Sequence, residues 1–287
     1  QVLIYSFILF SACMICHGEL AKIAPDARRL TLYYLVIALG GFLGSAFVTF
    51  VAPMLFIQFT EFPLAIIATL VLFIASFVFC QQQAEKLLIA KPVIVVLLVL
   101  TTGGLIALFS QMNLLFNQHH IANNRNFYGL LSVVDIKNEQ FNERRLIDGS
   151  TSHGTQSLDD SESHIPKSYY RKNTGVALAL EQYLSTNMMF EAMNVGFIGL
   201  GAGTLAAYGR KGEYYRFYEL NPAVETFAQQ HFSYLSQSKA TIDIAIGDGR
   251  QLLQQEFDEY GSQDFDILVL DAFTGDAIPT HLLTQEA

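Results

Sequence analysis

The chain has 287 residues, of which 52% are hydrophobic and only 15% are charged. Soluble globular domains average about 45–50% apolar and about 25% charged residues. This composition excludes a disordered tail, a collagen-like fibre and a disulfide-rich scaffold, and it argues against an ordinary soluble protein.

The charges divide the chain into two parts. Residues 1–120 carry five basic and four acidic residues, whereas residues 121–287 carry 12 basic and 22 acidic residues, a net charge of −10. We predict transmembrane helices over residues 1–120 and a globular part after them. The chain begins inside an apolar run and ends just after a helix start, so we interpret it as part of a longer protein.

Four apolar runs predict about four membrane spans: residues 2–16, 30–56, 62–80 and 92–116. A helix needs roughly 20 apolar residues to cross the hydrocarbon core. The last three runs are long enough, and the first would be with a few more residues upstream. Core helices of a soluble domain are the alternative, which so few charges over so long a stretch disfavour.

The membrane part shows little chemistry of its own. No charged residue lies in the middle of a predicted span, so nothing indicates a proton relay or an ion path. Residues 13–17 (CMICH) match the attachment pattern of c-type haem, but a polar helix end at the membrane surface is the interpretation we favour.

The expected location is a multi-pass protein of the inner or plasma membrane, in contact with lipid, with its globular part in the cytoplasm. The charges of the loops between the predicted spans conflict with a cytoplasmic position of the globular part. Residues 18–29 and 81–91 carry the basic residues, which favours a cytoplasmic position for both loops. Four simple spans would then place residues 121–287 outside, away from a nucleoside-derived co-substrate.

Residues 121–171 are predicted to form a small module. Two strand-like segments, 126–135 and 144–147, indicate a β-hairpin, and the polar residues 149–167 indicate a flexible loop. A helix is predicted over 174–185.

Residues 172–287 then alternate between strands and helices. Strands are predicted over 194–200, 214–220, 241–246 and 265–270, with helices over 204–209, 222–231 and 250–257. Such alternation predicts an α/β Rossmann-like domain, a parallel sheet with helices on both faces. Its ligands bind at the carboxyl ends of the strands.

Three strand ends carry the pattern of a nucleoside site. Gly199, Gly201 and Gly203 form a turn that lets the backbone approach a ligand closely. About twenty residues on, Glu219 is placed to hold a ribose diol, and Asp248 to accept a hydrogen bond from adenine. This series favours S-adenosylmethionine-type binding over a dinucleotide. The alternatives are a surface acid paired with Arg216 for Glu219 and a turn residue for Asp248.

The fourth strand ends at Asp271, and Asp276 follows five residues later. Carboxylates beside a sulfonium suit a cationic amine, which becomes a nucleophile when a general base takes its proton. The net negative charge favours a polyamine substrate and argues against nucleic acid. Asp276 has a second interpretation as a turn residue.

Several motifs together resemble the spermidine synthase (polyamine aminopropyltransferase) family, and more closely its membrane-fused members. They are residues 126–129 (NFYG), 148–149 (DG), 153–156 (HGTQ), 169–170 (YY), 199–204 (GLGAGT), 219–222 (ELNP), 247–250 (GDGR) and 271–273 (DAF), with residues 16–21, 30–34 and 40–44 in the membrane part.

The resemblance implies decarboxylated S-adenosylmethionine as co-substrate and no metal. Gly199, Gly201, Gly203 and Gly249 would line its site, with Glu219 on the ribose, Asp248 on the adenine and Gln156 over the aminopropyl end. Asp271 and Asp276 would be catalytic, with Tyr170 and Asp271 on the amine. The sequence departs from the family in the Asp271–Asp276 spacing, in lacking an acid after Tyr169-Tyr170, and in Asn221, where an Asp is common.

The sequence therefore predicts a membrane-anchored transferase that moves an aminopropyl group to a diamine such as putrescine. An S-adenosylmethionine-dependent methyltransferase and a non-catalytic polyamine sensor or transporter stay as alternatives, and a homodimer is left open.

Overall fold

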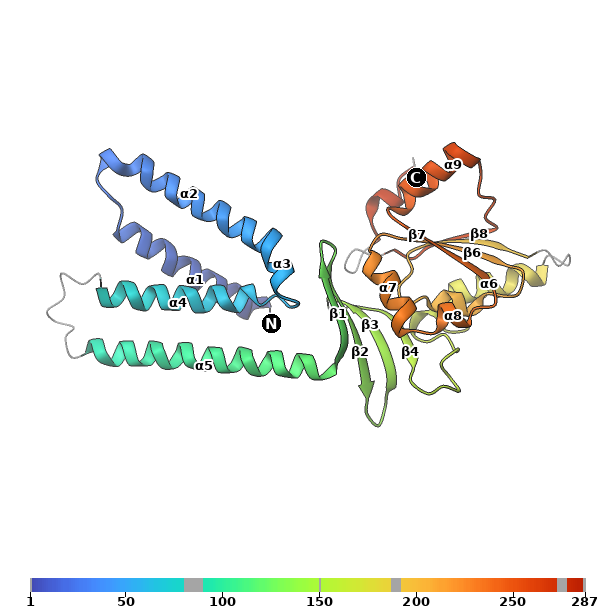
Figure 1. The fold of residues 1–287 in the computed structure, drawn as a ribbon, viewed down its shortest axis with the longest axis horizontal. Coiled ribbons are helices and arrows are strands. Elements are labelled where there is room, and N and C mark those ends of the chain that lie inside the picture. The colour runs from blue at the N-terminus through green and yellow to red at the C-terminus, as the bar shows by residue number, and fades with distance from the viewer. Residues whose placement is uncertain (1, 80–89, 150, 187–191, 273–277, 286–287) are drawn as a thin grey trace. The chain divides into compact units, whose positions relative to one another are not determined.

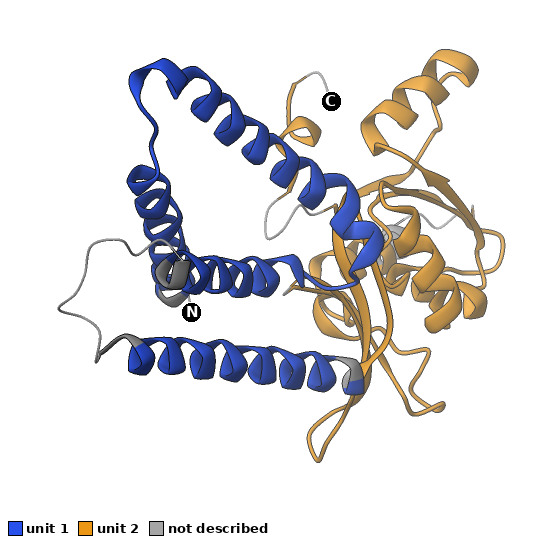
Figure 2. Ribbon diagram, turned by 60° about the vertical axis from the view of Figure 1, so that its left-hand side comes forward, with its two compact units in different colours: residues 1–118 blue, residues 119–287 orange. Residues whose placement is uncertain are grey.

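The computed structural model describes residues 2–79, 90–149, 151–186, 192–272 and 278–285. It divides into two compact units, residues 1–118 and residues 119–287 (Figure 2). The first unit is helical, and the second contains two four-stranded sheets.

The helices of the first unit lie where the four apolar runs predict them. They are α1 (Val2–Lys22), α2 (Leu30–Ala46), α4 (Glu61–Phe79) and α5 (Ala90–His119), and the short 3₁₀ turn η1 (Ala27–Arg29) leads into α2 (Figure 1). Large apolar side chains such as Phe10 and Phe42 are exposed along them.

A widened π-helical turn, η2 (Phe47–Val51), joins α2 to the short helix α3 (Ala52–Leu55). Its cause is Pro53, which has no N–H to donate to the carbonyl of Thr49 and whose ring crowds that carbonyl.

Two stretches of the described helices are long and apolar enough to cross a membrane. They are Ala27–Leu55 and Pro92–Phe116, and only 6% of the apolar window in each is buried. The apolar part of α4, Glu61–Ser76, is shorter. These two stretches correspond to the predicted spans 30–56 and 92–116, and their length and composition are sufficient for a membrane span.

The second unit starts with an antiparallel sheet in the order β1-β2-β3-β4. Its strands are β1 (His120–Asn126), β2 (Gly129–Lys137), β3 (Asn142–Asp148) and β4 (Thr151–Ser157). The predicted flexible loop is therefore wrong over β4, and the predicted hairpin is part of a four-stranded sheet. Strand β4 has no apolar pattern because six of its residues are polar, and its glycine, Gly154, packs so closely that a Cβ there would lie 2.3 Å from the Cβ of Ala202.

The second sheet is parallel throughout, as predicted, with the order β7-β6-β5-β8. Its strands are β5 (Asn194–Ile198), β6 (Tyr214–Glu219), β7 (Thr241–Ile246) and β8 (Ile267–Leu270). The chain steps outward from β5 through β6 to β7 and then returns to the other side of β5. This reversal creates a topological switch point between β5 and β8, where open α/β sheets bind ligands.

Helices cover both faces of the parallel sheet, as predicted (Figure 1). On one face, Phe197 and Phe217 pack in a core that contains residues of α6 (Gly175–Thr186) and α7 (Pro222–His231). On the other, Ile198 and Tyr218 pack with leucines of α9 (Gly249–Tyr260). A further short helix, α8 (Tyr234–Gln237), follows α7.

Residues 204–209, predicted as a helix, form only the 3₁₀ turn η5 (Thr204–Tyr208). Gly209 is extended and ends this turn, because the chain must enter β6 at Tyr214.

Candidate functional site

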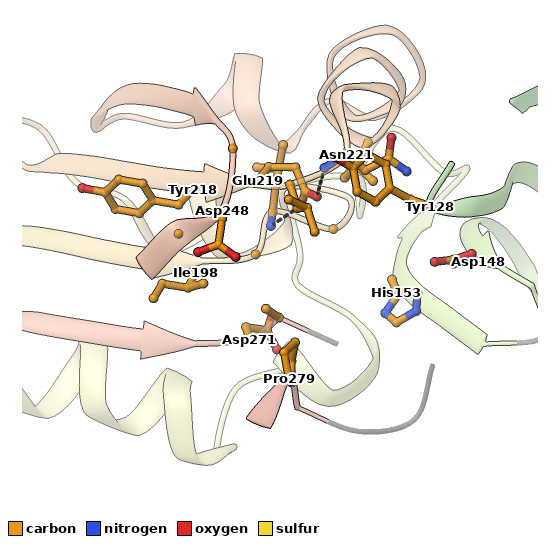
Figure 3. Close-up of a pocket in the computed structure, with 18 of the residues that line it drawn as sticks. Tyr128, Asp148, His153, Ile198, Tyr218, Glu219, Asn221, Asp248, Asp271 and Pro279 are labelled. Atoms are coloured by element: carbon orange, nitrogen blue, oxygen red, sulfur yellow. Dashed lines mark hydrogen bonds between the residues drawn. The ribbon is translucent and has the colours of Figure 1, made fainter. Parts of the chain in front are cut away.

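A cavity of about 360 Å³ lies at the carboxyl ends of the parallel strands, within residues 119–287. Figure 3 shows Asp248, Ile198 and Tyr218 on one side of it, Tyr128, Asp148 and His153 on the other, and Glu219 between them. Four carboxylates line the cavity: Asp148, Glu219, Asp248 and Asp271. None of the described residues that line it is a lysine or an arginine.

The glycine-rich turn after β5 forms part of the wall. Gly199 and Gly201 have φ angles of +108° and +54°. A Cβ on Gly199 would lie 2.5 Å from the carbonyl oxygen of Asp271, and one on Gly201 would lie 2.5 Å from the carbonyl oxygen of His153. Both positions therefore require glycine, and the turn presents backbone to the cavity.

The other two predicted glycines differ in position. Gly249 begins α9 and lines the cavity, where a Cβ would lie 2.7 Å from a methyl carbon of Ile198. Gly203 lies outside the lining and allows the turn into η5, with a φ of +75° and Leu235 against it.

Glu219 ends β6 and ties two loops together. One carboxylate oxygen accepts a hydrogen bond from the N–H of Leu200 at 3.0 Å, and the other accepts one from the N–H of Asn221 at 2.9 Å. Burial raises the pKa of Glu219, against the lowering effect of these bonds. The N–H of Leu220 also lowers the pKa of Glu219, and a carboxylate with about four acceptor positions still has room for a hydroxyl of a ligand.

Asp248 caps α9 at the far side of the cavity. Its Oδ1 accepts a hydrogen bond from the N–H of Gln251 at 3.0 Å, and its Oδ2 lies 2.9 Å from Nε2 of His281. His281 belongs to the 3₁₀ turn η6 (Thr280–Leu282), and Pro279 and Leu282 beside it also line the cavity. Contact with His281 was not predicted from the sequence.

Asp271 follows β8 at the switch point and is hydrogen-bonded to Tyr170, so the structure brings these two predicted site residues together. The Tyr170 hydroxyl lies 2.5 Å from Oδ2 of Asp271 and 3.1 Å from the hydroxyl of Tyr169. A phenol hydroxyl has a single proton to donate. We therefore assign the Tyr170 hydroxyl as the donor to Asp271 and the Tyr169 hydroxyl as the donor to the Tyr170 oxygen.

Burial raises the pKa of Asp271 to about 6, even though the hydrogen bond from Tyr170 lowers it. The pKa of Tyr170 is raised well above its usual value, first by burial and then by the charge of Asp271. Near neutral pH, Asp271 is therefore mostly ionised and Tyr170 is protonated. Asp271 is a carboxylate suited to accept a proton there.

Gln156 lies outside the cavity lining. Its buried amide donates to the carbonyl of Ser163 and the hydroxyl of Ser233, and its oxygen accepts the N–H of Ser233. The amide thus joins β4 to the segment before α8. Asp276 lies outside the described residues.

Several lining residues were given no role by the sequence prediction: Phe127, Tyr128, Asp148, His153, Asn221 and His281. All of them except His281 belong to motifs in the resemblance, and Asp148 also ends a strand, so their position was a usable signal. Asn221 caps α7 and accepts a hydrogen bond from Asn126, a contact across 95 residues that no local pattern reveals.

The strand order and the cavity at the switch point define an α/β unit of the ligand-binding type. No protein-family model matches the chain. No curated protein matches it either. Among solved structures, it is similar to a probable spermidine synthase from Corynebacterium glutamicum, with 12% sequence identity and a TM-score of 0.42. The match covers 57% of this chain and 56% of that one, so the chain spans just over half of the length of that protein.

Proposed function

We propose that the cavity binds decarboxylated S-adenosylmethionine and that the protein transfers its aminopropyl group to a diamine such as putrescine. The charge of the cavity carries this proposal. Four carboxylates line it, without a lysine or arginine among the described lining residues. Such a site attracts a ligand with positive charges, and its described lining offers a ligand's carboxylate no lysine or arginine, only His153 and His281.

The same observation separates the two nucleoside substrates. S-adenosylmethionine carries a carboxylate that needs a partner when it is buried, whereas its decarboxylated form carries only a sulfonium and an ammonium. The lining therefore favours aminopropyl transfer over methyl transfer. Glu219, Gly199 and Asp248 would hold the nucleoside, and Asp271 with Tyr170 would face the reacting amine.

The reaction needs one bond to form and one to break. The amine nitrogen donates its lone pair to the methylene carbon next to the sulfonium, and the carbon–sulfur bond breaks with its electrons going to sulfur. Methylthioadenosine and an aminopropylated amine result, and the proton lost by the nitrogen goes to the Asp271 carboxylate. Alignment of the amine and this proton transfer are the contributions of the protein.

Residues 1–118 would anchor this unit in the membrane by several spans. The support is the exposed apolar surface of the helices, of which Ala27–Leu55 and Pro92–Phe116 are long enough to cross. We place the α/β unit in the cytoplasm, where nucleoside co-substrates are made. A membrane-impermeant protease applied to intact cells should leave this unit uncut, and its cleavage would contradict this placement.

Calorimetric titration of the purified full chain tests the nucleoside site. Decarboxylated S-adenosylmethionine should bind roughly 5- to 150-fold more tightly than S-adenosylmethionine, because the latter would bury an unpaired carboxylate at a cost of about 1–3 kcal/mol. A preference for the carboxylated form would indicate a methyltransferase. Tight nucleoside binding without turnover, together with amine uptake in vesicles, would indicate a sensor or transporter.

A further inference from the structure

The nucleoside site proposed above leaves the side of the cavity formed by the antiparallel sheet without a role. Asp148 from β3, His153 from β4, and Phe127 and Tyr128 from the β1–β2 turn line it (Figure 3). We propose that Asp148 and Tyr128 form a subsite for a primary alkylammonium group. This inference rests on the proposed function and deepens it, because it names the protein group that recognises a substrate amine.

Asp148 differs from the other three carboxylates of the cavity. Glu219 accepts two backbone N–H groups, Asp248 caps a helix, and Asp271 accepts the Tyr170 hydroxyl. None of the hydrogen bonds between described residues ends on the Asp148 carboxylate, and the charges that act on it include the attraction of His153 and the repulsion of Glu219. Asp148 thus has lone pairs available for a ligand donor.

The environment of Asp148 favours a cation. Burial raises its pKa, which means that the carboxylate is partly removed from water. A desolvated carboxylate gains most from a charged partner, and a hydrogen bond to a charged group contributes about 1.5–3 kcal/mol. Leu131 and Leu146 line the same side of the cavity and suit the methylene groups of an alkyl chain.

The β1–β2 turn holds the aromatic part of the subsite in place. The Asn126 side chain accepts a hydrogen bond from the N–H of Tyr128 at 2.9 Å and donates one to Asn221 at 2.7 Å. Asn221 in turn donates its N–H to Glu219, so the turn is tied to the loop that carries the predicted ribose ligand. An aromatic ring beside a cation adds attraction through its π face.

Gly129 ends the turn, and its surroundings account for the glycine at the last position of the NFYG motif. Its φ is +134°, and a Cβ there would lie 3.2 Å from Oδ1 of Asp148. A side chain at this position would strain the backbone and press on the carboxylate. The motif thus puts an aromatic ring and its hydrogen-bonded tether at the wall of the cavity that Asp148 also lines, with the bare position against the Asp148 carboxylate.

An alkylammonium occurs in both substrates, at the end of the aminopropyl arm and at the far end of the diamine. Titrations of the full chain with decarboxylated S-adenosylmethionine and with putrescine distinguish the aminopropyl arm from the diamine as the ligand of this subsite. Methylthioadenosine, which has no ammonium group, is the reference ligand. We compare Asp148→Asn with Asp160→Asn, the same charge change at an exposed position.

Asp148→Asn should leave the affinity for methylthioadenosine within twofold of wild type and weaken an ammonium-bearing ligand roughly 10- to 100-fold. Loss confined to decarboxylated S-adenosylmethionine assigns the subsite to the aminopropyl arm, and loss confined to putrescine, also seen as a higher KM, assigns it to the diamine. Tyr128→Leu should weaken the same ligand less, and Tyr128→Phe should restore it.

Unchanged affinity for both amines would overturn the subsite, as would an equal loss for methylthioadenosine, which would mean that Asp148 only supports the fold. If wild-type protein binds no nucleoside, the proposed function fails, and the putrescine titration still tests Asp148 by itself.

Discussion

The two units use side-chain hydrogen bonds differently, although Gln58 also reaches Asn113 and Ser76 reaches Glu19 between helices of the first unit. In the helical unit, the hydroxyls of Ser11, Thr69, Thr101 and Thr102 each donate to the carbonyl four residues earlier in the same helix. In the α/β unit, Tyr170 reaches Asp271 across 101 residues, and Asn126 reaches Asn221 across 95. Bonds within a helix leave its outer surface apolar, as hydrocarbon requires, whereas long-range bonds assemble a site.

The largest expected effect lies in the α/β unit. Asp271→Asn should lower kcat by about a hundred- to ten-thousandfold, because the variant cannot take the proton from the attacking amine. Methylthioadenosine affinity should stay the same, since the proposed role of Asp271 is toward the amine. The measurement is steady-state kinetics with titration of the product. A variant that keeps wild-type kcat would remove Asp271 from the mechanism.

A charge in an apolar helix tests the other unit. Leu100 lies in α5 with 66% of its side chain exposed, and Leu100→Lys should cost about 3 kcal/mol on insertion if that helix spans the bilayer. The inserted fraction of α5 itself, measured by the side of the membrane on which a tag placed after it lies, should fall roughly a hundredfold relative to the fraction that is not inserted. Leu178→Lys on α6 is the matched control and should not alter insertion. Equal behaviour of both variants would contradict membrane spanning.

Glu219→Gln should weaken binding of methylthioadenosine and of decarboxylated S-adenosylmethionine equally, by roughly 10- to 100-fold. In the glutamine, an NH₂ group replaces one of the two carboxylate oxygens. This donor opposes the backbone N–H that the oxygen accepted, and it cannot accept a ribose hydroxyl. Calorimetry measures the loss, and Glu259→Gln at an exposed position is the control. Full affinity in Glu219→Gln would show that the nucleoside lies elsewhere.

The raised pKa of Asp271 also predicts an effect on stability. A carboxyl whose pKa rises from 3.8 to about 6 on folding stabilises the protein below pH 4, and this contribution is lost as the pH rises through 6. Asp271→Asn should therefore increase the free energy of unfolding by about 1–2 kcal/mol at pH 7, less than the full shift implies because the group is partly exposed. Thermal melting at pH 7 and pH 4 should show a gain only at pH 7. A lower melting temperature at pH 7 would contradict the assignment.

The smallest effect concerns the hydrogen bond to Asp271. Wild-type kcat should fall as the pH drops below about 6, because Asp271 becomes protonated. Tyr170→Phe removes the donor that lowers this pKa, so the acidic limb of the pH profile should move to higher pH. Tyr260→Phe, at a residue that is 79% exposed, should leave the profile unchanged. An acidic limb that does not move would separate Tyr170 from Asp271.

Most of the parallel sheet was predictable because its strands are apolar and end at glycine or acidic residues. The ranges of β7 and α7 agree with the prediction to the residue. Strand β4 was missed because its sequence, TSHGTQS, is polar, and its burial comes from Gly154 packing on Ala202. Periodicity detects a strand that buries apolar side chains, and this one buries hydrogen-bonded polar groups instead.

The site was partly predictable for a similar reason. Glu219, Asp248 and Asp271 end successive strands, so topology alone brings them to one edge of the sheet. The contact of His281 with Asp248 depends on how a later segment packs, and the engagement of Gln156 with Ser233 depends on α8, which was not predicted. Strand ends can be located from a sequence, whereas the partners of a side chain depend on the packing of other elements.

The most direct test of the account is product analysis with purified full-length protein, decarboxylated S-adenosylmethionine and putrescine. We expect methylthioadenosine and the aminopropylated diamine to form in equal amounts, with no methylated product. Absence of methylthioadenosine with every di- and polyamine tried would contradict the proposed aminopropyl transfer.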